Sequence, residues 1–255
     1  MNIKEYKLSP QALVMVQGSS KGTQPKYYEN GYWYKVNQCG YEGLSEYLVS
    51  KVLECSNADD YAAYEPCIIN GRSGCQSKNF LKENESFLSF QRLYELMTGE
   101  SLQDRIRLMS QVADRIGFVK EFLMEYTGFD CSRYLSQILT LDMLTLNTDR
   151  HLNNLGLIVD TSASLYKAAP IFDNGNALLS DWDRFCEETI EENLENVYGQ
   201  PFSVSLESQA HEAGIGLKLN YKKLESILEQ EPESRGLEVL KYQLIRYRSL
   251  IPDFL

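Results

Sequence analysis

The stretch NTDRHLNN, residues 147–154, is the densest run of polar side chains within an otherwise apolar part of the chain. The segment before it, YLSQILTLDMLTL (134–146), has the pattern of a buried helix, and LGLIV (155–159) after it has the pattern of a strand. Functional residues are often found on a loop that two rigid elements hold in place. Asn147 and Asp149 alone could serve as capping or turn residues, but the whole cluster predicts a functional site.

A second polar group, Asp173 in IFDNG, follows the next predicted strand at 165–172. The two strands would form a hairpin, which brings Asp173 back beside Asp149 and Asn154. Carboxylate and amide oxygens are ligands that Mg²⁺ accepts, with phosphate oxygens and waters completing its shell. A carboxylate before Asn-Gly is often only a turn residue, and the pairing with the first cluster is what favours a metal ligand here.

The spacing from Asp149 to Asn154 is Asp-x-x-x-x-Asn. Kinase catalytic loops have this spacing, with the Asp accepting the proton of the substrate hydroxyl and the Asn binding metal. Asp173 would then take the place of the second metal ligand. The spacing alone is a weak signal, and the hairpin that ends in FDNG strengthens it.

The first third of the chain is richer in predicted strands than the rest. Strands are expected at ALVMV (12–16) and YWYKV (32–36), with a hairpin signal at Asn30-Gly31, and a boundary or hinge is expected in the polar segment 70–86. The remaining expected elements are a helix at 43–55, a strand at 61–69, and helices at 87–97, 101–116, 118–126, 132–146, 221–230 and 236–250. The pattern predicts an α+β fold with a strand-rich part, residues 1–80, and a larger helical part, residues 81–255.

Two features of the strand-rich part could bind phosphate. The loop GSSKGTQPK (18–26) could turn backbone N–H groups toward an anion, although a solvated hairpin tip is the better interpretation of the loop taken alone. Lys35 lies within an apolar strand, and Glu46 on the following helix is the natural partner for a buried lysine. Kinases pair such residues to orient the ATP phosphates. Alternatively, Lys35 faces solvent with its stem packed on Trp33.

The order of these features is a phosphate loop, a strand lysine, a helix glutamate, a catalytic aspartate with an asparagine, and a metal-binding aspartate. A bilobal phosphotransferase requires this order, with the nucleotide bound between a small strand-rich lobe and a larger helical lobe.

NTDRHLNNLG followed by PIFDNG resembles the kinase domain of HipA-like proteins, the toxin kinases of bacterial toxin–antitoxin pairs, and especially their compact CtkA-like branch. GTQPK (22–26) resembles the phosphate loop of the same family. The wider relatives, the phosphatidylinositol kinases, also place the histidine after the aspartate. The resemblance implies a bilobal, protein-kinase-like fold that uses ATP and Mg²⁺.

The resemblance also implies a role for each matched residue. Asp149 corresponds to the catalytic base, and His151 and Asn147 support its loop. Asn154 and Asp173 correspond to the Mg²⁺ ligands. The nucleotide-binding residues implied are Ser19, Ser20, Lys21, Gly22, Lys35 and Glu46. Ser19 or Ser20 is the implied site of autophosphorylation.

Composition limits the classes of function. The 255 residues carry a formal net charge of −11, which argues against a sequence-independent nucleic-acid binder. No apolar run is long enough for a membrane-spanning helix. Six scattered cysteines and two histidines favour free thiols in a cytoplasmic protein over disulfides or a zinc site. Secretion as an effector is left open.

The expected partners are a protein substrate of unknown identity and, by resemblance, an antitoxin-type protein. No membrane or direct nucleic-acid binding is expected. The chain shows no counterpart of the extra N-terminal subdomain of HipA, so the mode of antitoxin binding is not carried over. The leading hypothesis is an autophosphorylating Ser/Thr protein kinase. The alternatives are a nucleotide-binding pseudokinase that acts as a regulator and a kinase for a lipid or small-molecule hydroxyl.

Overall fold

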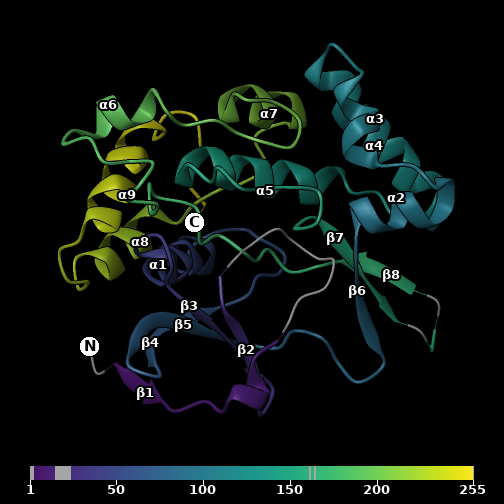
Figure 1. Cartoon of the computed structure of the whole chain (residues 1–255). Helices are drawn as coiled ribbons and strands as arrows, with labels where there is room; N and C mark the ends of the chain where they lie inside the picture. The colour runs from purple at the N-terminus through teal and green to yellow at the C-terminus, as the bar shows by residue number, and fades with distance from the viewer. Residues whose placement is uncertain (1–2, 15–23, 161, 164, 255) are drawn as a thin grey trace.

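The computed structural model describes residues 3–14, 24–160, 162–163 and 165–254. A small strand-rich part and a larger helical part lie one above the other, and a second, smaller sheet lies at the side of the helical part (Figure 1). The predicted α+β architecture of two unequal parts is confirmed.

The strand-rich part is built on a five-stranded sheet with the order β1-β4-β5-β3-β2. β1 pairs in parallel with β4, and the other pairs are antiparallel. Two tight turns, Asn30-Gly31 and Asn70-Gly71, connect β2 to β3 and β4 to β5, and all four residues have the positive φ that such hairpin turns require. The strands are β1 (Lys4–Tyr6), β2 (Lys26–Glu29), β3 (Tyr32–Val36), β4 (Tyr64–Ile69) and β5 (Arg72–Lys78).

Of the strand expected at 12–16, the described residues 12–14 do not pair with β3. Instead Pro10–Ala12 forms a short 3-10 helix, Leu13 makes a single bridge to Tyr27, and residues 15–16 lie outside the described part of the chain. The two-residue turn at Asn30-Gly31 determines this outcome, because it forces the residues just before it, which are β2, to pair with β3.

The hinge expected over 70–86 is wrong in its first half, because residues 72–78 form β5 in the middle of the sheet. Gly74, one of the two glycines that make this segment resemble a hinge, has a packing role. A Cβ on Gly74 would lie 2.1 Å from the carbonyl oxygen of Lys35, so only glycine allows this close approach between β5 and β3. The chain then passes to the helical part through residues 79–84.

The helical part carries the antiparallel sheet β6-β7-β8, formed by Glu85–Ser89, Gly156–Asp160 and Leu165–Ala168. The helix expected to start at 87 starts at Phe90, because 85–89 form β6 and Ser89 caps the helix. The helices expected at 101–116 and 118–126 are divided differently, with a break after Arg107. The helices are α2 (Phe90–Thr98), α3 (Leu102–Arg107), α4 (Val112–Thr127), α5 (Ser132–Thr145), α6 (Ile190–Leu194), α7 (Leu206–Ala213), α8 (Tyr221–Leu228) and α9 (Arg235–Arg246).

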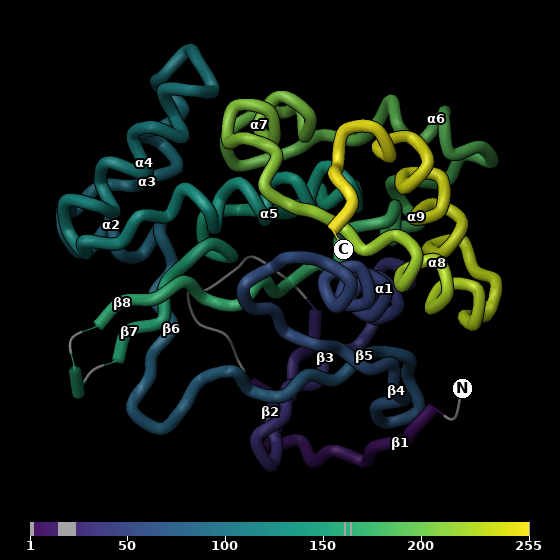
Figure 2. Tube along the Cα trace, turned by 180° about the vertical axis from the view of Figure 1, so that it is seen from behind, coloured from purple at the N-terminus to yellow at the C-terminus, as the bar shows by residue number. Residues whose placement is uncertain are grey.

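Helix α1 (Glu42–Glu54) joins the two parts. It follows β3, lies on the five-stranded sheet and contacts α8 and α9 on its other side (Figure 2). Its apolar residues, including Leu48 and Val52, belong to the same hydrophobic core as helices α2 to α9. One core therefore crosses the expected division near residue 80, and that division of the chain into two domains stays a prediction.

Candidate active site

The polar loop 147–154 lies between the end of α5 and the start of β7, as the sequence predicts. Helix α5 ends where Leu146 adopts a left-handed conformation with φ of 57°, and the N–H of Asn147 donates to the carbonyl of Asp142 at 3.0 Å. Helix α5, which is buried from residue 137 to its end, and the paired strand β7 hold the two ends of the loop.

A buried ion pair fixes the loop from within. Arg150 is fully buried and its guanidinium donates to both carboxylate oxygens of Asp142, at 3.0 to 3.2 Å. It also donates to the carbonyl of Phe172 at 2.7 Å and to the side chain of Asn174 at 2.5 Å. Burial alone would lower the pKa of Arg150, but the carboxylate of Asp142 raises it. Helix α5, the loop and the segment around Asp173 are thereby connected through one side chain.

Asp149 has each carboxylate oxygen bound by a neutral amide donor. Gln200 donates to Oδ1 at 3.0 Å and Asn176 donates to Oδ2 at 3.2 Å. The backbone N–H of Asp149 also donates to the side chain of Asn147 at 3.1 Å. Burial raises the pKa of Asp149, and the negative charge of Asp173 adds to this rise. The carboxylate is therefore both oriented and made more basic than an ordinary aspartate.

His151 supports the loop through its backbone. Its N–H donates to the carbonyl of Asp149 at 2.9 Å, and its own carbonyl accepts from the N–H of Asn154 at 2.8 Å. The ring nitrogen Nδ1 is buried and has no hydrogen-bond partner among the described residues. The side-chain hydrogen bond expected to brace the loop is therefore not seen at this nitrogen.

Lys35 lies at the centre of a cluster of charges. Its ammonium group donates to Glu46 of α1 and to Oδ1 of Asp173, the latter at 2.6 Å. It also lies 5.1 Å from the centre of the Tyr64 ring. Burial alone would lower the pKa of Lys35, but the carboxylates of Asp173 and Glu46 outweigh it and raise the pKa well above its usual value. The interpretation that Lys35 faces solvent is wrong, since only 7% of the residue is exposed.

The Asp173 carboxylate faces two lysines. Besides its contact with Lys35, it lies 3.9 Å from the ammonium group of Lys26 on β2. Burial would raise its pKa, but Lys35 and Lys26 outweigh burial and lower the pKa of Asp173 below its usual value. Asp173 has a positive φ of 60° and its N–H donates to the hydroxyl of Tyr64 at 3.4 Å. The carboxylate is therefore held ionised at the surface of a cavity.

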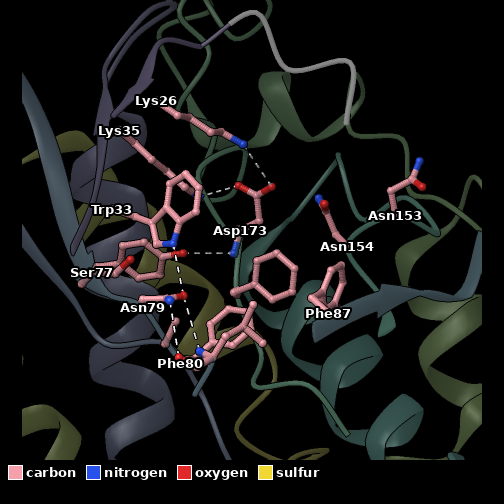
Figure 3. Close-up of a pocket in the computed structure, with 14 residues that line it drawn as sticks. Lys26, Trp33, Lys35, Ser77, Asn79, Phe80, Phe87, Asn153, Asn154 and Asp173 are labelled. Carbon is pink, nitrogen blue, oxygen red and sulfur yellow. Dashed lines mark hydrogen bonds and ion pairs between the residues drawn. The ribbon is translucent and has the colours of Figure 1, made fainter. Parts of the chain in front are cut away.

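That cavity lies between the five-stranded sheet and the loop (Figure 3). One end is lined by aromatic rings, with the centres of Phe87 and Phe80 lying 5.3 and 5.5 Å from the centre of the Phe172 ring in edge-on and tilted arrangements. The other end is charged and polar. Its side chains come from Lys26, Lys35, Asn154 and Asp173. A molecule with a flat apolar base and an anionic tail matches both ends.

The side chains of Asn154 and Asp173 reach into the same cavity (Figure 3). The Asn154 amide nitrogen lies 3.5 Å from the carbonyl of Asp149, which leaves its amide oxygen as the atom for a metal. One carboxylate and one amide oxygen fit Mg²⁺ when phosphate and water supply the other ligands. The described residues contain no group of three or more His, Cys, Asp or Glu side chains able to hold a metal ion, so such phosphate ligands would be required.

Helix α1 also binds the segment that follows Asp173. The Ser45 hydroxyl donates to the carbonyls of Asn174 and Ala177, each at 2.9 Å, and the Tyr41 hydroxyl donates to the carbonyl of Leu178 at 2.6 Å. These bonds lie beside the contact between Lys35 and α1, so they hold the lysine, the helix and the segment after Asp173 in one arrangement.

The structure thus brings together Lys35, Glu46, Asp149, Asn154 and Asp173 as the sequence analysis expects. Ser19, Ser20, Lys21 and Gly22 lie outside the described residues, so the predicted phosphate loop has no structural account. The sequence analysis missed several partners. These are Lys26, Asp142, Arg150, Asn176 and Gln200. Asp142 could have been found, because a carboxylate within an apolar helix needs a buried partner.

The small strand-rich part and the larger helical part together form a bilobal, kinase-like fold, and comparison with a solved structure supports this assignment of the fold. No family model and no curated protein matches the sequence. The proinflammatory kinase CtkA of Helicobacter pylori is similar with a TM-score of 0.67 and 16% identity, over 98% of this chain and 95% of that one. HipA of Shewanella oneidensis, solved with HipB and operator DNA, gives a TM-score of 0.47 at 14% identity, over 94% and 66%. The likeness to CtkA confirms the predicted kinase-like fold. Among the described residues, no helix is both long and apolar enough to cross a membrane.

Proposed function

We propose that the protein is an ATP- and Mg²⁺-dependent Ser/Thr protein kinase of the HipA-like type. The observation that carries this proposal is the ion-paired arrangement of Lys35, Glu46 and Asp173 at the charged end of a cavity whose other end is aromatic. This arrangement is suited to a nucleoside triphosphate, with the base between the rings and the phosphates at the lysines. We therefore call this space the nucleotide cavity.

In the proposed reaction Asp149 orients the acceptor hydroxyl and accepts its proton as the hydroxyl oxygen attacks the terminal phosphorus of ATP. The bond from that phosphorus to the bridging oxygen breaks, and ADP leaves with this oxygen. Lys35, oriented by Glu46, binds the phosphates that remain on ADP. Mg²⁺, held by Asn154 and Asp173, would neutralise charge on the transferred group. Positioning and electrostatics provide most of the catalysis in this class of reaction.

The test is transfer of radioactive phosphate from ATP, measured on the protein itself and on a general protein acceptor. We expect the wild type to label itself, and Lys35→Met to label at least about 100-fold less, because removal of an electrostatic contact to the phosphates costs roughly that factor. Lys167→Met is the matched control, since Lys167 is another strand lysine but is 55% exposed in its side chain and pairs with Glu85. Equal labelling by Lys35→Met and wild type would refute the proposal.

Autophosphorylation on Ser19 or Ser20 is part of the proposal. A phosphate there would carry about two negative charges and would repel the phosphates of ATP from the loop. In the same assay, the double variant Ser19→Ala/Ser20→Ala should lose self-labelling and keep transfer to the general acceptor. When both proteins are made in a bacterial host, intact-mass measurement should find one phosphate on the wild type and none on the variant.

We expect the pH profile of transfer to depend on Gln200. Asp149 must be ionised to accept a proton, so activity falls as pH drops through its pKa, which burial raises above the ordinary value of about 4. Gln200 donates to the ionised form, so Gln200→Leu should raise this pKa further and move the acid limb up by about 1 pH unit. Gln230→Leu is the control, because Gln230 donates to a backbone carbonyl on an exposed part of the chain. An unshifted acid limb in Gln200→Leu would show that the contact has no role in catalysis.

One observation favours the pseudokinase as a second candidate. The ammonium group of Lys35 lies 2.6 Å from one oxygen of the Asp173 carboxylate and that of Lys26 lies 3.9 Å from the other, and this carboxylate is the proposed metal ligand. ATP binding without transfer to the protein or to a general acceptor would support it.

A cytoplasmic location is also proposed, supported by six unpaired cysteines, four of which are buried. An antitoxin-type partner stays a prediction from the sequence resemblance.

A further inference from the structure

A groove lies between the segment around α6 and the start of α7, both of which lie above α5 in Figure 1. It has a volume of about 320 Å³ and shares no lining residue with the nucleotide cavity. We call this space the α6–α7 groove. Most of its side chains are apolar, and they come from Met143, Leu146, Leu194, Val197, Tyr198 and Val204.

The interior of the α6–α7 groove is open to water but has no net charge. Val204 is 72% exposed and Tyr198 is 54% exposed, so apolar surface faces the solvent there. The two charged groups that line the groove neutralise each other, because the guanidinium of Arg246 lies 3.0 Å from the carboxylate of Glu207. The hydroxyl of Tyr247 also donates to Glu207 at 2.5 Å. The groove is therefore suited to an apolar side chain and not to an ion.

The segment that forms one wall of the groove is strongly acidic. Residues 181–195 contain seven Asp or Glu and a single Arg, so they carry a net charge of −6, more than half of the −11 of the whole chain. Within the part of the chain that the structure describes, none of these seven carboxylates forms an ion pair. We call them the acidic rim, and they are Asp181, Asp183, Glu187, Glu188, Glu191, Glu192 and Glu195.

The one basic residue of this segment holds the groove wall in place and does not neutralise the rim. The guanidinium of Arg184 lies 5.1 Å from the centre of the Phe185 ring and 5.8 Å from that of Tyr198. It also donates to the carbonyl of Asn196 at 2.9 Å. Arg184 thus fixes Tyr198 at the groove and leaves the charge of the rim unbalanced.

We propose that the α6–α7 groove and its acidic rim dock a segment of a partner polypeptide that carries several lysines or arginines beside one or two large apolar side chains. The apolar side chains would enter the groove, and the basic ones would pair with the rim. This partner is bound and not phosphorylated here, since Asp149 does not line the groove. The inference therefore goes beyond the proposed kinase activity.

The charges argue against the other possible occupants. A metal ion does not fit, because the described residues contain no group of three or more His, Cys, Asp or Glu side chains able to hold one. The carboxylates are instead spread over fifteen consecutive residues, which suits a chain with several positive charges. A nucleic acid has the same sign of charge as the rim. A second copy of this chain in a two-fold dimer would place the acidic rim against itself.

The experiment measures binding of a fluorescent 12-residue peptide of leucine and lysine to the whole protein by fluorescence anisotropy, without ATP. The comparison peptides are oligolysine of the same length and a peptide in which glutamate replaces each lysine. We expect the leucine–lysine peptide to bind at least about tenfold more tightly than either, because only it matches both the groove and the rim. Its affinity should fall as salt is added, since salt screens the rim.

One variant tests the groove. Val204→Ser removes an exposed apolar side chain from the groove and should weaken the leucine–lysine peptide at least about fivefold, with binding of oligolysine unchanged. Leu165→Ser is the matched control, because Leu165 is 65% exposed but lies on β8 outside the groove. This control should bind both peptides as the wild type does.

A second variant tests the rim. Glu195→Lys adds two positive charges beside Leu194 of the groove, and we expect it to weaken the leucine–lysine peptide at least about fivefold at low salt. Glu125→Lys on α4 is the matched control. Glu125 is likewise exposed and forms no ion pair among the described residues, but it lies outside the acidic rim. The control changes the net charge of the protein equally and should keep most of the wild-type affinity.

Several results would overturn the proposal. Equal binding of oligolysine and the leucine–lysine peptide, or full binding by Val204→Ser, would show that the groove takes no part. Equal weakening by Glu195→Lys and Glu125→Lys would show that only the overall charge matters. A dimer in sedimentation that Val204→Ser dissociates would assign the groove to a second copy. None of these measurements requires phosphate transfer, so they are separate from the test of the kinase.

Discussion

Replacement of Asp149 by Asn is expected to lower phosphate transfer by about 10²- to 10⁴-fold, the range that a positioned acid or base contributes. Asparagine has the same shape, and it can still contact Asn176 and Gln200, whose amides can turn to suit a neutral partner. It cannot accept the acceptor proton or stabilise positive charge. We therefore expect the chemical step to fail while the fold and the affinity for ATP are retained.

The measurement combines single-turnover transfer of labelled phosphate with equilibrium binding of ATP. Asn153→Ala is a useful comparison, because Asn153 lies on the same loop but no catalytic role is assigned to it. A transfer rate in Asp149→Asn within a few-fold of wild type would contradict the assignment of the base. Loss of ATP binding together with transfer would show that the substitution disturbs the nucleotide cavity.

Replacement of Asp142 by Ala is expected to cause the largest loss of stability. The substitution leaves the guanidinium of Arg150 fully buried without a counter-charge, which typically costs about 3–5 kcal/mol. For a chain of this size that loss corresponds to a decrease in Tm on the order of 10 °C. The same change should lower activity, because Arg150 connects the loop of Asp149 to the residues around Asp173.

Two further variants isolate the effect of burial. Asp59→Ala removes a bidentate pair with Arg133 at 2.7 and 2.8 Å that lies on the surface, and its Tm should stay within about 2 °C of wild type. Asp142→Leu/Arg150→Met removes both buried charges and should recover part of the lost stability. A Tm for Asp142→Ala equal to that of Asp59→Ala would show that the buried pair does not stabilise the fold.

The parts of the site that could be predicted are those fixed by local sequence. Asp149 and Asn154 lie on one loop, and the hairpin of β7 and β8 is short enough to return Asp173 to that loop. Lys35 and Glu46 are joined by one turn between a strand and a helix. In each case only a few residues separate the regular elements that carry these side chains, so the spacing along the sequence predicts which side chains lie close together.

The parts that could not be predicted depend on contacts between distant segments. Gln200 reaches Asp149 from 51 residues away, and nothing in its own surroundings indicates an active-site residue. Lys26 was within the polar loop that the sequence singled out, but its approach to Asp173 depends on the pairing of β2 with β3. The sequence of the central strand β5 predicts a hinge, because glycine and serine are typical both of a flexible segment and of a strand packed closely on its neighbour.

The hydrogen bonds from Tyr41 and Ser45 to the backbone after Asp173 bear on how such an enzyme could be controlled. In protein kinases the lysine must pair with a glutamate, and the position of the helix that carries the glutamate controls whether it does, so an outward rotation of that helix would separate the two. Here the same outward rotation would break several buried hydrogen bonds and open the shared core at Leu48. The pairing of Lys35 with Glu46 is thus part of the fold, and restraint of the proposed kinase would have to come from blocked access to its cavities instead of a helix movement.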